Sequence, residues 1–400
     1  MEFKSSLSLG YLHSFHKVSQ YFGATIFTFD QQQRRLVILK SPAWYQKLFR
    51  LRLFLGFCMT TASIFQAINY YNQDHNAHKS HSTNVLLQAA FYISCHYSFI
   101  YINWTHVKKQ REMVNFINAI IDFEQRELAP RPEYRENSEG SQVCKFILQN
   151  TALNIVAVMA GRFVATYNFP CLPDLAGNFL LKECQSESGS LEISLTPILM
   201  SVVKLGIVLW NWIVLSIFYI GFNCDLVCFS YLPCFFFNKC LQVLSRMIAK
   251  PTQAKRKVEL LRQFQILLIS YNDIHQRFGV VCGAGQSVII LTICSYALIR
   301  LGPTLIPLHI MFFLAAGTQA FITIVFVFGT LGNVYRTSEM VLQQAKKAGG
   351  QRSDLWFRRV LKSWPKQKIR FGEVNYLDSL APFTLIHFSI SLTVNMLLVK

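Results

Sequence analysis

Charged residues are scarce in this chain of 400 residues, and acidic ones are the scarcest. Asp, Glu, Lys and Arg together make up 15% of the sequence, against roughly 25% in soluble domains. Only 21 residues are Asp or Glu while 39 are Lys or Arg, which gives a formal net charge of +18. Because 52% of the residues are hydrophobic, this composition excludes an ordinary soluble protein and a disordered chain.

Motifs of catalysis, cofactor binding and metal binding are also lacking. The sequence contains no Gly-rich phosphate loop, no Gly-x-Ser-x-Gly and no His-Glu-x-x-His, so we expect neither an enzyme nor a cofactor. His75, His78 and His81 could bind a metal weakly, but a solvated loop is the simpler interpretation. Lys and Arg gather between apolar runs rather than on patterned soluble faces, which excludes a nucleic-acid-binding protein.

Long apolar runs are what the chain has in abundance. A transmembrane helix needs about 20 mostly apolar residues to cross the hydrocarbon core of a bilayer. Seven runs meet this requirement, at residues 53–71, 85–104, 146–167, 195–222, 280–299, 305–331 and 377–398. The sequence therefore predicts an all-α membrane protein with seven transmembrane helices.

The distribution of Lys and Arg between the runs predicts the orientation of the chain. Alternate connecting segments carry 31 and 3 of these residues, and Lys and Arg are concentrated on the cytoplasmic side of membrane proteins. We therefore expect a cytoplasmic N-terminus and an extracellular C-terminus. This is the inverse of a G-protein-coupled receptor, whose Asp-Arg-Tyr and Asn-Pro-x-x-Tyr motifs are also missing from the third and seventh runs. The basic segments are residues 1–50, 105–142, 237–278 and 333–374; the others are 72–83, 169–194, 301–304 and 399–400.

The predicted cytoplasmic segments have apolar residues at helical spacing. Two interpretations are open: surface helices that lie on the bilayer, or inward extensions of the spans that pack into a cytosolic bundle. The periodic residues are Met113, Ile117, Ile120, Ile121 and Leu128 after the second run, Val258, Leu261, Gln265 and Leu268 before the fifth, and Leu355, Trp356 and Val360 before the seventh.

Aromatic, polar and charged residues gather at the outer level of the second to sixth runs. Charge inside a membrane is costly and often functional, so one interpretation is an outward-opening, aromatic-lined ligand pocket. The other is snorkelling cations within an interfacial aromatic belt. The outer halves of these runs lack Asp and Glu, which favours an apolar ligand. The candidate ligand-binding residues are Tyr92, His96, Arg162, Tyr167, Lys204, Trp210, Tyr296 and His309.

Two cysteines share the predicted second outer loop. Cys171 and Cys184 would lie in an oxidising compartment, where disulfides persist. The sequence leaves open whether they form a disulfide or remain reduced. Among the other cysteines we expect no metal site.

Polar residues form a stripe along the seventh run. Thr384, His387, Ser391 and Asn395 are spaced by three or four residues and so share one helical face. The stripe predicts either hydrogen bonds between helices or a water-lined pathway. One amphipathic span cannot enclose a pore alone, so the pathway requires several subunits. The candidate pore-lining residues are these four, with Val394 and Leu398 as a hydrophobic constriction near the outer end.

The layout of the whole chain resembles the insect gustatory receptor family. Local similarity lies in the segments Tyr-Asn-Asp-Ile-His-Gln-Arg-Phe-Gly at 271–279 and Phe-Gly-Glu-Val-Asn at 371–375. The family has Thr-Tyr, five apolar residues and Gln-Phe in its last span. Here the matching residues are Phe388-Ser389, Ile390 to Val394, and Asn395-Met396, and only Asn395 keeps the chemistry. The sequence is therefore similar to a divergent member.

The resemblance implies a tetrameric, ligand-gated, non-selective cation channel in the plasma membrane of gustatory receptor neurons. Its ligand would be a small-molecule tastant, with bitter or other apolar compounds favoured. The alternatives are a secondary transporter and an accessory subunit of a heteromeric taste receptor. In this interpretation residues 1–50 form a cytoplasmic segment, 51–334 hold spans one to six with the ligand pocket and cytosolic helix extensions, 335–376 form a cytosolic anchor between subunits, and 377–400 form the pore-lining helix.

Overall fold

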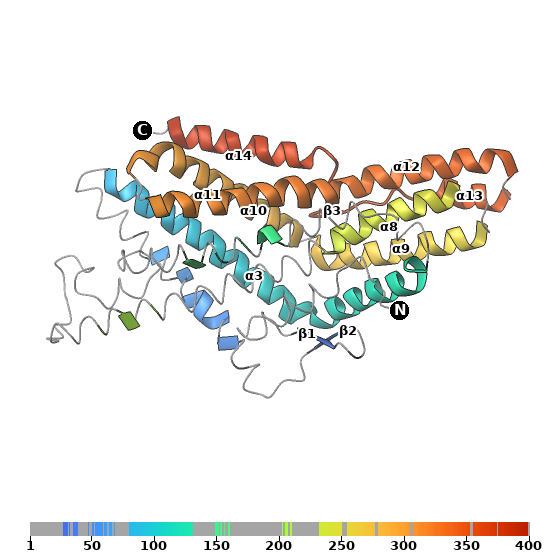
Figure 1. The fold of residues 1–400 in the computed structure, drawn as a ribbon, viewed down its shortest axis with the longest axis horizontal. Helices are drawn as coiled ribbons and strands as arrows, with labels where there is room; N and C mark the ends of the chain where they lie inside the picture. The colour runs from blue at the N-terminus through green and yellow to red at the C-terminus, as the bar shows by residue number, and fades with distance from the viewer. Residues whose placement is uncertain are drawn as a thin grey trace.

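A computed structural model shows an elongated protein whose long helices run close to the long axis (Figure 1). The structure describes residues 27–30, 32, 35–38, 80–130, 232–249, 254–276, 279–304, 307–352, 355–373 and 375–398, with short stretches and single residues within 47–68, 149–160 and 202–209. The third and fourth predicted spans lie largely outside the described residues, and the first is described only in part. The structure therefore bears on the second span and on the fifth to seventh.

Helices dominate the described part of the chain. They are α3 (Ser80–Phe123), α8 (Leu232–Ala249), α9 (Ala254–His275), α10 (Gly279–Tyr296), α11 (Pro307–Ile322), α12 (Gly329–Arg352), α13 (Leu355–Ser363) and α14 (Ala381–Leu398). The π-helical turns η1 (Glu124–Leu128), η4 (Ala297–Leu301) and η6 (Thr323–Phe328) and the 3-10 turn η5 (Gly302–Thr304) continue or join them. Two antiparallel hairpins complete the fold, β1 (Phe27–Asp30) with β2 (Arg35–Ile38) and β3 (Arg370–Phe371) with β4 (Asn375–Tyr376).

Three helical stretches of the described residues are long and apolar enough to cross a membrane. They span Gly279–Arg300, Ile310–Gln344 and Ala381–Leu398, and they coincide with the fifth, sixth and seventh predicted spans. The predicted second span lies within the 44-residue helix α3, which bends at Lys109, where the backbone leaves the helical region with φ −113° and ψ 24°. These helices agree with the predicted all-α class, and α14 begins at Ala381 rather than at residue 377.

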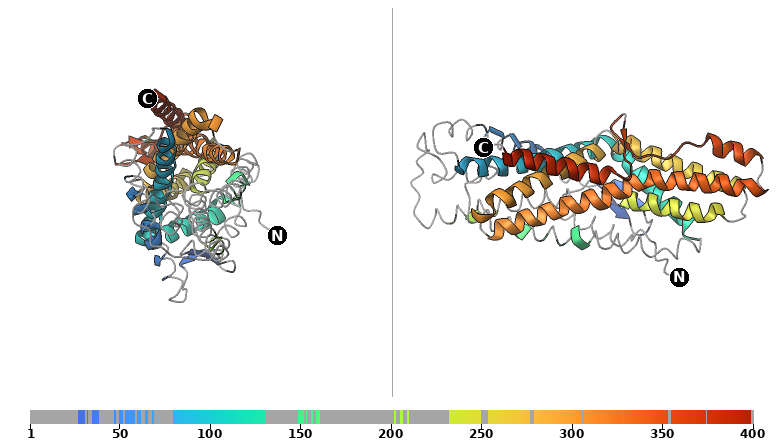
Figure 2. Two further views of the ribbon diagram at one scale, coloured as in Figure 1. Left: turned by 90° about the vertical axis from the view of Figure 1, so that its left-hand side faces the viewer. Right: turned by 90° about the horizontal axis from the view of Figure 1, so that it is seen from above.

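The sixth predicted span continues far beyond its expected end. Helix α11, the turn η6 and helix α12 follow one another directly, so the chain remains helical from Pro307 to Arg352. Figure 2 shows this rod crossing most of the length of the molecule. The predicted boundary between residues 334 and 335 therefore lies inside α12.

Beyond the apolar stretches, the helices pack around a shared core. The C-terminal part of α3 and helices α8, α9 and α12 bury their apolar faces against one another, and each fully buried Phe or Leu contributes about 1.5–3 kcal/mol. The rings of Phe116, Phe237, Phe264 and Tyr271 meet with centroid distances of 5.4 to 6.3 Å. This arrangement supports the bundle interpretation over isolated surface helices. Of the periodic residues, Met113, Ile117, Ile120, Ile121, Leu128, Val258, Leu261 and Leu268 are buried, Gln265 and Val360 are half-buried, and Trp356 is exposed. The side chain of Leu355 lies outside the described part of the chain.

The N-terminal hairpin joins this core through its backbone and two apolar side chains. Phe27 and Leu36 are buried. The side-chain amide of Asn118 on α3 accepts the N–H of Leu36 at 2.7 Å and donates to its carbonyl oxygen at 2.8 Å. Arg35 pairs with Asp122 at 3.2 Å. The sequence did not predict these strands.

Candidate functional site

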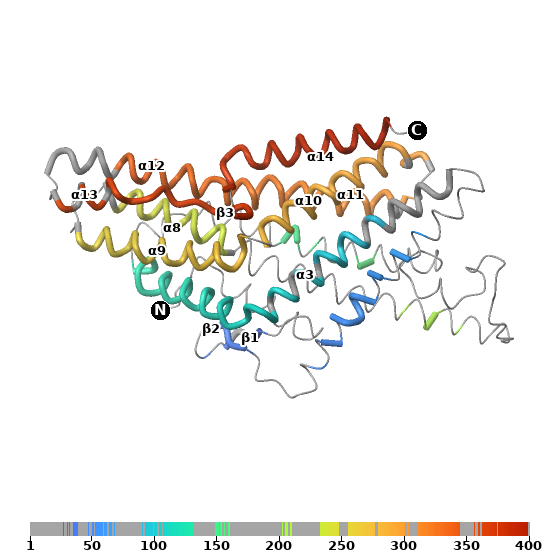
Figure 3. Tube along the Cα trace, turned by 180° about the vertical axis from the view of Figure 1, so that it is seen from behind, coloured from blue at the N-terminus to red at the C-terminus, as the bar shows by residue number. Residues whose placement is uncertain are grey.

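Helix α14 is the least covered of the three apolar helices. Only 17% of its length is buried, against 56% for the stretch at α10 and 50% for the stretch beginning in α11. Figure 3 shows α14 along the edge of the molecule, beside α10 and α11. A helix that is hydrophobic and exposed in a single chain must meet lipid or another subunit, because such a surface is unstable in water.

The predicted polar stripe lies on the exposed side of α14. Thr384, His387 and Asn395 are exposed and Ser391 is half-buried. Their hydrogen bonds stay within the helix: Thr384 donates to the carbonyl of Leu380 at 3.3 Å, and the Ser391 hydroxyl lies 3.4 Å from Nδ1 of His387. Within the described chain, none of the four bonds to another helix. The stripe therefore does not form hydrogen bonds between the described helices of this chain.

The predicted constriction residues share this exposed side. Val394 and Leu398 have exposed fractions of 46% and 73%. The apolar side chains of Phe383, Phe388 and Ile390 are also exposed. The uncovered surface of α14 thus combines polar and apolar positions.

The opposite face of α14 carries a buried group of hydroxyls that the sequence analysis missed. Ser389 and Thr393 are buried, and the Ser389 hydroxyl lies 3.0 Å from that of Thr292 on α10. Ser389 also lies 3.4 Å from the carbonyl oxygen of Val288, and Thr393 donates to the Ser389 carbonyl at 2.9 Å. Ser389 and Thr393 are four residues apart and so share a helical face, which differs from the face of the polar stripe. This spacing is the sequence signal that could have revealed the second polar face.

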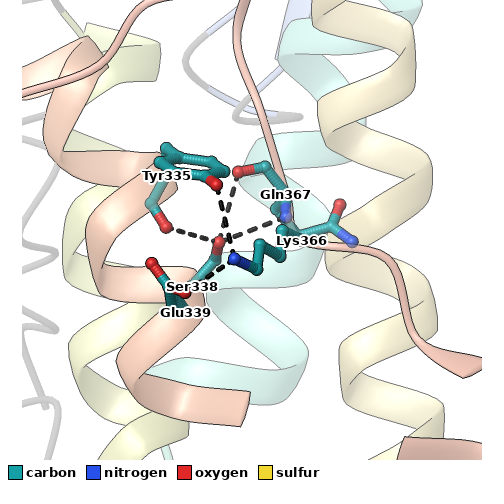
Figure 4. Close-up of polar contacts among 5 residues, drawn as sticks. All are labelled: Tyr335, Ser338, Glu339, Lys366 and Gln367. Carbon is teal, nitrogen blue, oxygen red and sulfur yellow. Dashed lines mark hydrogen bonds and ion pairs between the residues drawn. The ribbon is translucent and has the colours of Figure 1, made fainter. Parts of the chain in front are cut away.

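The segment that leads into α14, here called the entry segment (residues 364–380), is fastened to α12. Figure 4 shows its contacts with Tyr335, Ser338 and Glu339. The Ser338 hydroxyl accepts the N–H of Gln367 at 3.1 Å and lies 3.2 Å from its carbonyl oxygen. Lys366 binds Glu339 at 2.6 Å and Tyr335 at 3.5 Å, and the hydrogen bond to Glu339 raises the pKa of Lys366.

Helix α9 holds the other side of the entry segment. The side-chain amide of Asn272 donates to the carbonyl oxygen of Lys368 and accepts the N–H of Arg370, both at 2.9 Å. The N–H of Gly372 donates to the carbonyl oxygen of Gln276 at 2.9 Å. Asn272 therefore pairs with the extended backbone as a neighbouring strand would.

The predicted ligand pocket is only partly within the described residues. His96 on α3 is buried, and Tyr296 on α10 is buried in a small apolar cluster with Phe313 and Ala316. Tyr92 and His309 lie on α3 and α11, but their side chains are outside the described part. Arg162, Tyr167, Lys204 and Trp210 are outside it entirely, as are Cys171 and Cys184. The pocket and the disulfide therefore remain predictions.

A polar network between α3 and α10 lies beside His96. The Ser98 hydroxyl donates to Oε1 of Gln286 at 2.6 Å, and Nε2 of Gln286 lies 3.4 Å from Sγ of Cys95. Cys282 approaches Ser98 at 3.6 Å. No sequence signal predicted this network, because Gln286 is a single amide in an apolar helix. In the described ranges, no three His, Cys, Asp or Glu side chains gather closely enough to hold a metal ion.

Comparisons with known proteins give a match in fold. No protein-family model and no curated protein matches the sequence. The solved structure of the insect olfactory receptor OR5 from Machilis hrabei matches with a TM-score of 0.72 and 12% identity over 97% of both chains. The structure of that receptor in complex with eugenol matches with a TM-score of 0.71 and 11% identity over 98% of both chains. The chain therefore has the fold of an insect olfactory receptor over nearly its whole length.

Proposed function

We propose that the chain is a subunit of a ligand-gated, non-selective cation channel that detects small molecules, and that it serves taste. The observation that carries the proposal is the exposed polar stripe of α14 in a chain with an insect receptor fold. The resemblance to gustatory receptors supports the sense of taste, and the absence of acidic residues from the outer halves of the second to sixth predicted spans favours bitter or other apolar compounds.

The exposed side of α14 supports the assignment of this helix to the pore. A polar stripe that makes no hydrogen bond to the other described helices can face water when the helices of several subunits surround an axis. The apolar side chains beside it, including Phe388 and Ile390, can contact lipid or a neighbouring subunit. Thr384, His387, Ser391 and Asn395 would line the pathway, with Val394 and Leu398 as its constriction.

Ligand binding would act on this pore through a conformational equilibrium. A ligand opens a channel only if it binds the open state more tightly than the closed state. The candidate pocket contains His96 and Tyr296, which are buried on α3 and α10. Because α10 also contacts α14, a ligand held against α10 would lie one helix away from the pore.

Electrical recording with substituted cysteines tests the proposal. The chain is expressed with and without related receptors, and cation current is recorded while apolar bitter compounds are applied. Ser391→Cys and Asn395→Cys should make the current sensitive to a water-soluble thiol reagent, whereas the buried Thr393→Cys should remain insensitive. Asn395→Leu should alter the conductance.

The remaining outcomes separate the alternatives. Ligand-driven uptake without channel current would replace the channel with a transporter. Current that depends on a related receptor, and that thiol reagents at positions 391 and 395 leave unchanged, would identify an accessory subunit.

A further inference from the structure

The contact between α10 and α14 is polar at one place. The Thr292 and Ser389 hydroxyls lie 3.0 Å apart, with exposed fractions of 4% and 1%. Thr292 Oγ1 lies 3.4 Å from the Ser389 carbonyl oxygen, and Ser389 Oγ lies 3.4 Å from the Val288 carbonyl oxygen. Among the described residues, every hydrogen bond from α14 to another helix involves Ser389.

The entry segment is held much more firmly. It bonds to Asn272 of α9, to Gln276 just after that helix, and to Ser338 and Glu339 of α12. The start of α14 is therefore tied to two helices by several hydrogen bonds. Among the described residues, the rest of the helix is joined to another helix by hydrogen bonds only at Ser389, and only 17% of its residues are buried. A displacement of α14 relative to α10 would break the Thr292–Ser389 contact before it broke the entry segment.

We propose that Thr292 and Ser389 form a latch that sets the balance between the closed and open states of the channel. The proposal rests on the proposed function and adds two positioning residues to it. If α14 moves away from α10, both hydroxyls lose their partners in apolar surroundings that include Val288 and Ile293. An unpaired buried hydroxyl is costly, so the latch favours the conformation described here over any in which α14 is displaced.

Agonist dose–response curves on the full-length channel test the latch. Thr292→Val keeps the shape of the side chain and removes its hydroxyl, and Ser389→Ala removes the partner. Each should shift the half-maximal agonist concentration about three- to tenfold, the size expected from one net hydrogen bond, with an opposite change in basal current. The double variant should shift it no further than one single variant, because the two residues act as a pair. Thr292→Ser retains the hydroxyl and should restore wild-type behaviour.

Thr393→Val is the matched control. Thr393 is as buried as Thr292, but among the described residues its hydroxyl bonds only to the Ser389 carbonyl within α14. Its loss should leave the half-maximal concentration within about twofold of wild type, well below the loss of an interhelical bond. If the latch variants have a lower half-maximal agonist concentration and a higher basal current, the latch holds the channel closed. If they have a higher half-maximal concentration and a lower basal current, the latch holds the channel open. Both results support the latch.

Unchanged dose–response curves at matched surface expression would overturn the latch, as would additive shifts in the double variant. A wild-type channel without current would overturn the proposed function instead. If the Val and Ala variants do not assemble, the pair Thr292→Cys and Ser389→Cys replaces them, because a thiol keeps a weak hydrogen-bonding group at each position. The two hydroxyls are close enough for a disulfide to be tested. Oxidation should then fix the current at one level that agonist no longer changes, and a reductant should restore the response to agonist. A full response to agonist in the oxidised, cross-linked channel would reject the latch.

Discussion

Gly332 of α12 lies directly against the peptide bond that follows Asp378, so that a β-carbon on Gly332 would overlap the carbonyl oxygen of Asp378. The backbones of α12 and of the entry segment thus approach as closely as atoms allow. Asp378 also shapes the turn that leads into α14, since its side chain accepts the N–H of Leu380 at 3.0 Å and its carbonyl accepts the N–H of Ala381 at 3.2 Å. The position of the α14 N-terminus therefore depends on the absence of a side chain at residue 332.

Gly332→Ala should displace the start of α14. The obstacle is backbone rather than a flexible side chain, so we expect a loss of about 1–3 kcal/mol in the free energy of unfolding, measured as a lower melting temperature in detergent. Gly285→Ala on α10 is the control, because a β-carbon there has no neighbour within 4 Å. Equal melting temperatures for the two alanine variants would contradict the close contact.

Asn272→Leu should loosen the entry segment. The substitution removes the partners of the Lys368 carbonyl and the Arg370 N–H together, at a cost of about 2 kcal/mol or more. Trypsin cleaves after Lys and Arg, so limited digestion should cut at 366–370 several-fold faster than in wild type. Asp273→Ala changes the adjacent exposed side chain and should digest at the wild-type rate; faster digestion in both variants would mean that the effect is not due to the amide.

Ser338→Ala and Glu339→Gln should differ in their effect, although the residues are adjacent. Ser338 is buried and accepts the N–H of Gln367, so its loss leaves a buried donor unpaired and costs about 1–3 kcal/mol. Glu339 binds the exposed Lys366, and exposed ion pairs contribute little. The melting temperature should fall in Ser338→Ala and stay at the wild-type value in Glu339→Gln. The opposite order would show that the ion pair holds the entry segment.

Acidification should destabilise the fold through His275. Its ring packs between Tyr271 and Gly279, and Nε2 has no hydrogen-bond partner in the described part of the chain. Burial, with a smaller effect of Lys109, lowers the pKa of His275 to about 3. The unfolded chain takes up this proton below its ordinary pKa of about 6.5. The stability that depends on neutral His275 is therefore complete above pH 6.5 and falls as the pH falls from there toward 3.

The melting temperature measured between pH 7.5 and 5 checks this expectation. Wild type should lose up to about 1.4 kcal/mol per pH unit below 6.5 from this one group, and His275→Asn should show a shallower dependence. Parallel curves for the two proteins would show that His275 does not titrate in this way.

The packed faces of α3 and α9 could be predicted because their signal is local. Met113, Ile117 and Ile120 recur at helical spacing, and all three are buried. The apolar stretch that begins at Gly279 was predicted to within one residue for the same reason. The polar stripe of α14 was likewise visible, since its residues share a face through spacing alone.

The fastening of α14 could not be predicted, because it depends on residues far apart in the sequence. Asn272 bonds to backbone groups 96 and 98 residues away. The local sequence around Gly332 gives no sign of its role, yet the absence of a side chain there allows α12 and the entry segment to approach closely. Strands β3 and β4 are two residues long and owe their pairing to this tertiary setting rather than to strand propensity. The contact between Thr292 and Ser389 exists only because α10 and α14 pack against each other.

The unbroken helix from Pro307 to Arg352 constrains how this sequence can change. At 1.5 Å per residue its 46 residues extend about 69 Å, more than twice the thickness of a hydrocarbon core of about 30 Å. Inserting or deleting one residue near its middle would rotate everything beyond that point by about 100° and turn both Gly332 and Ser338 away from the entry segment. A substitution along this helix therefore perturbs only its own contacts, whereas a change in the length of the helix would displace the contacts of Gly332 and Ser338 with the entry segment together.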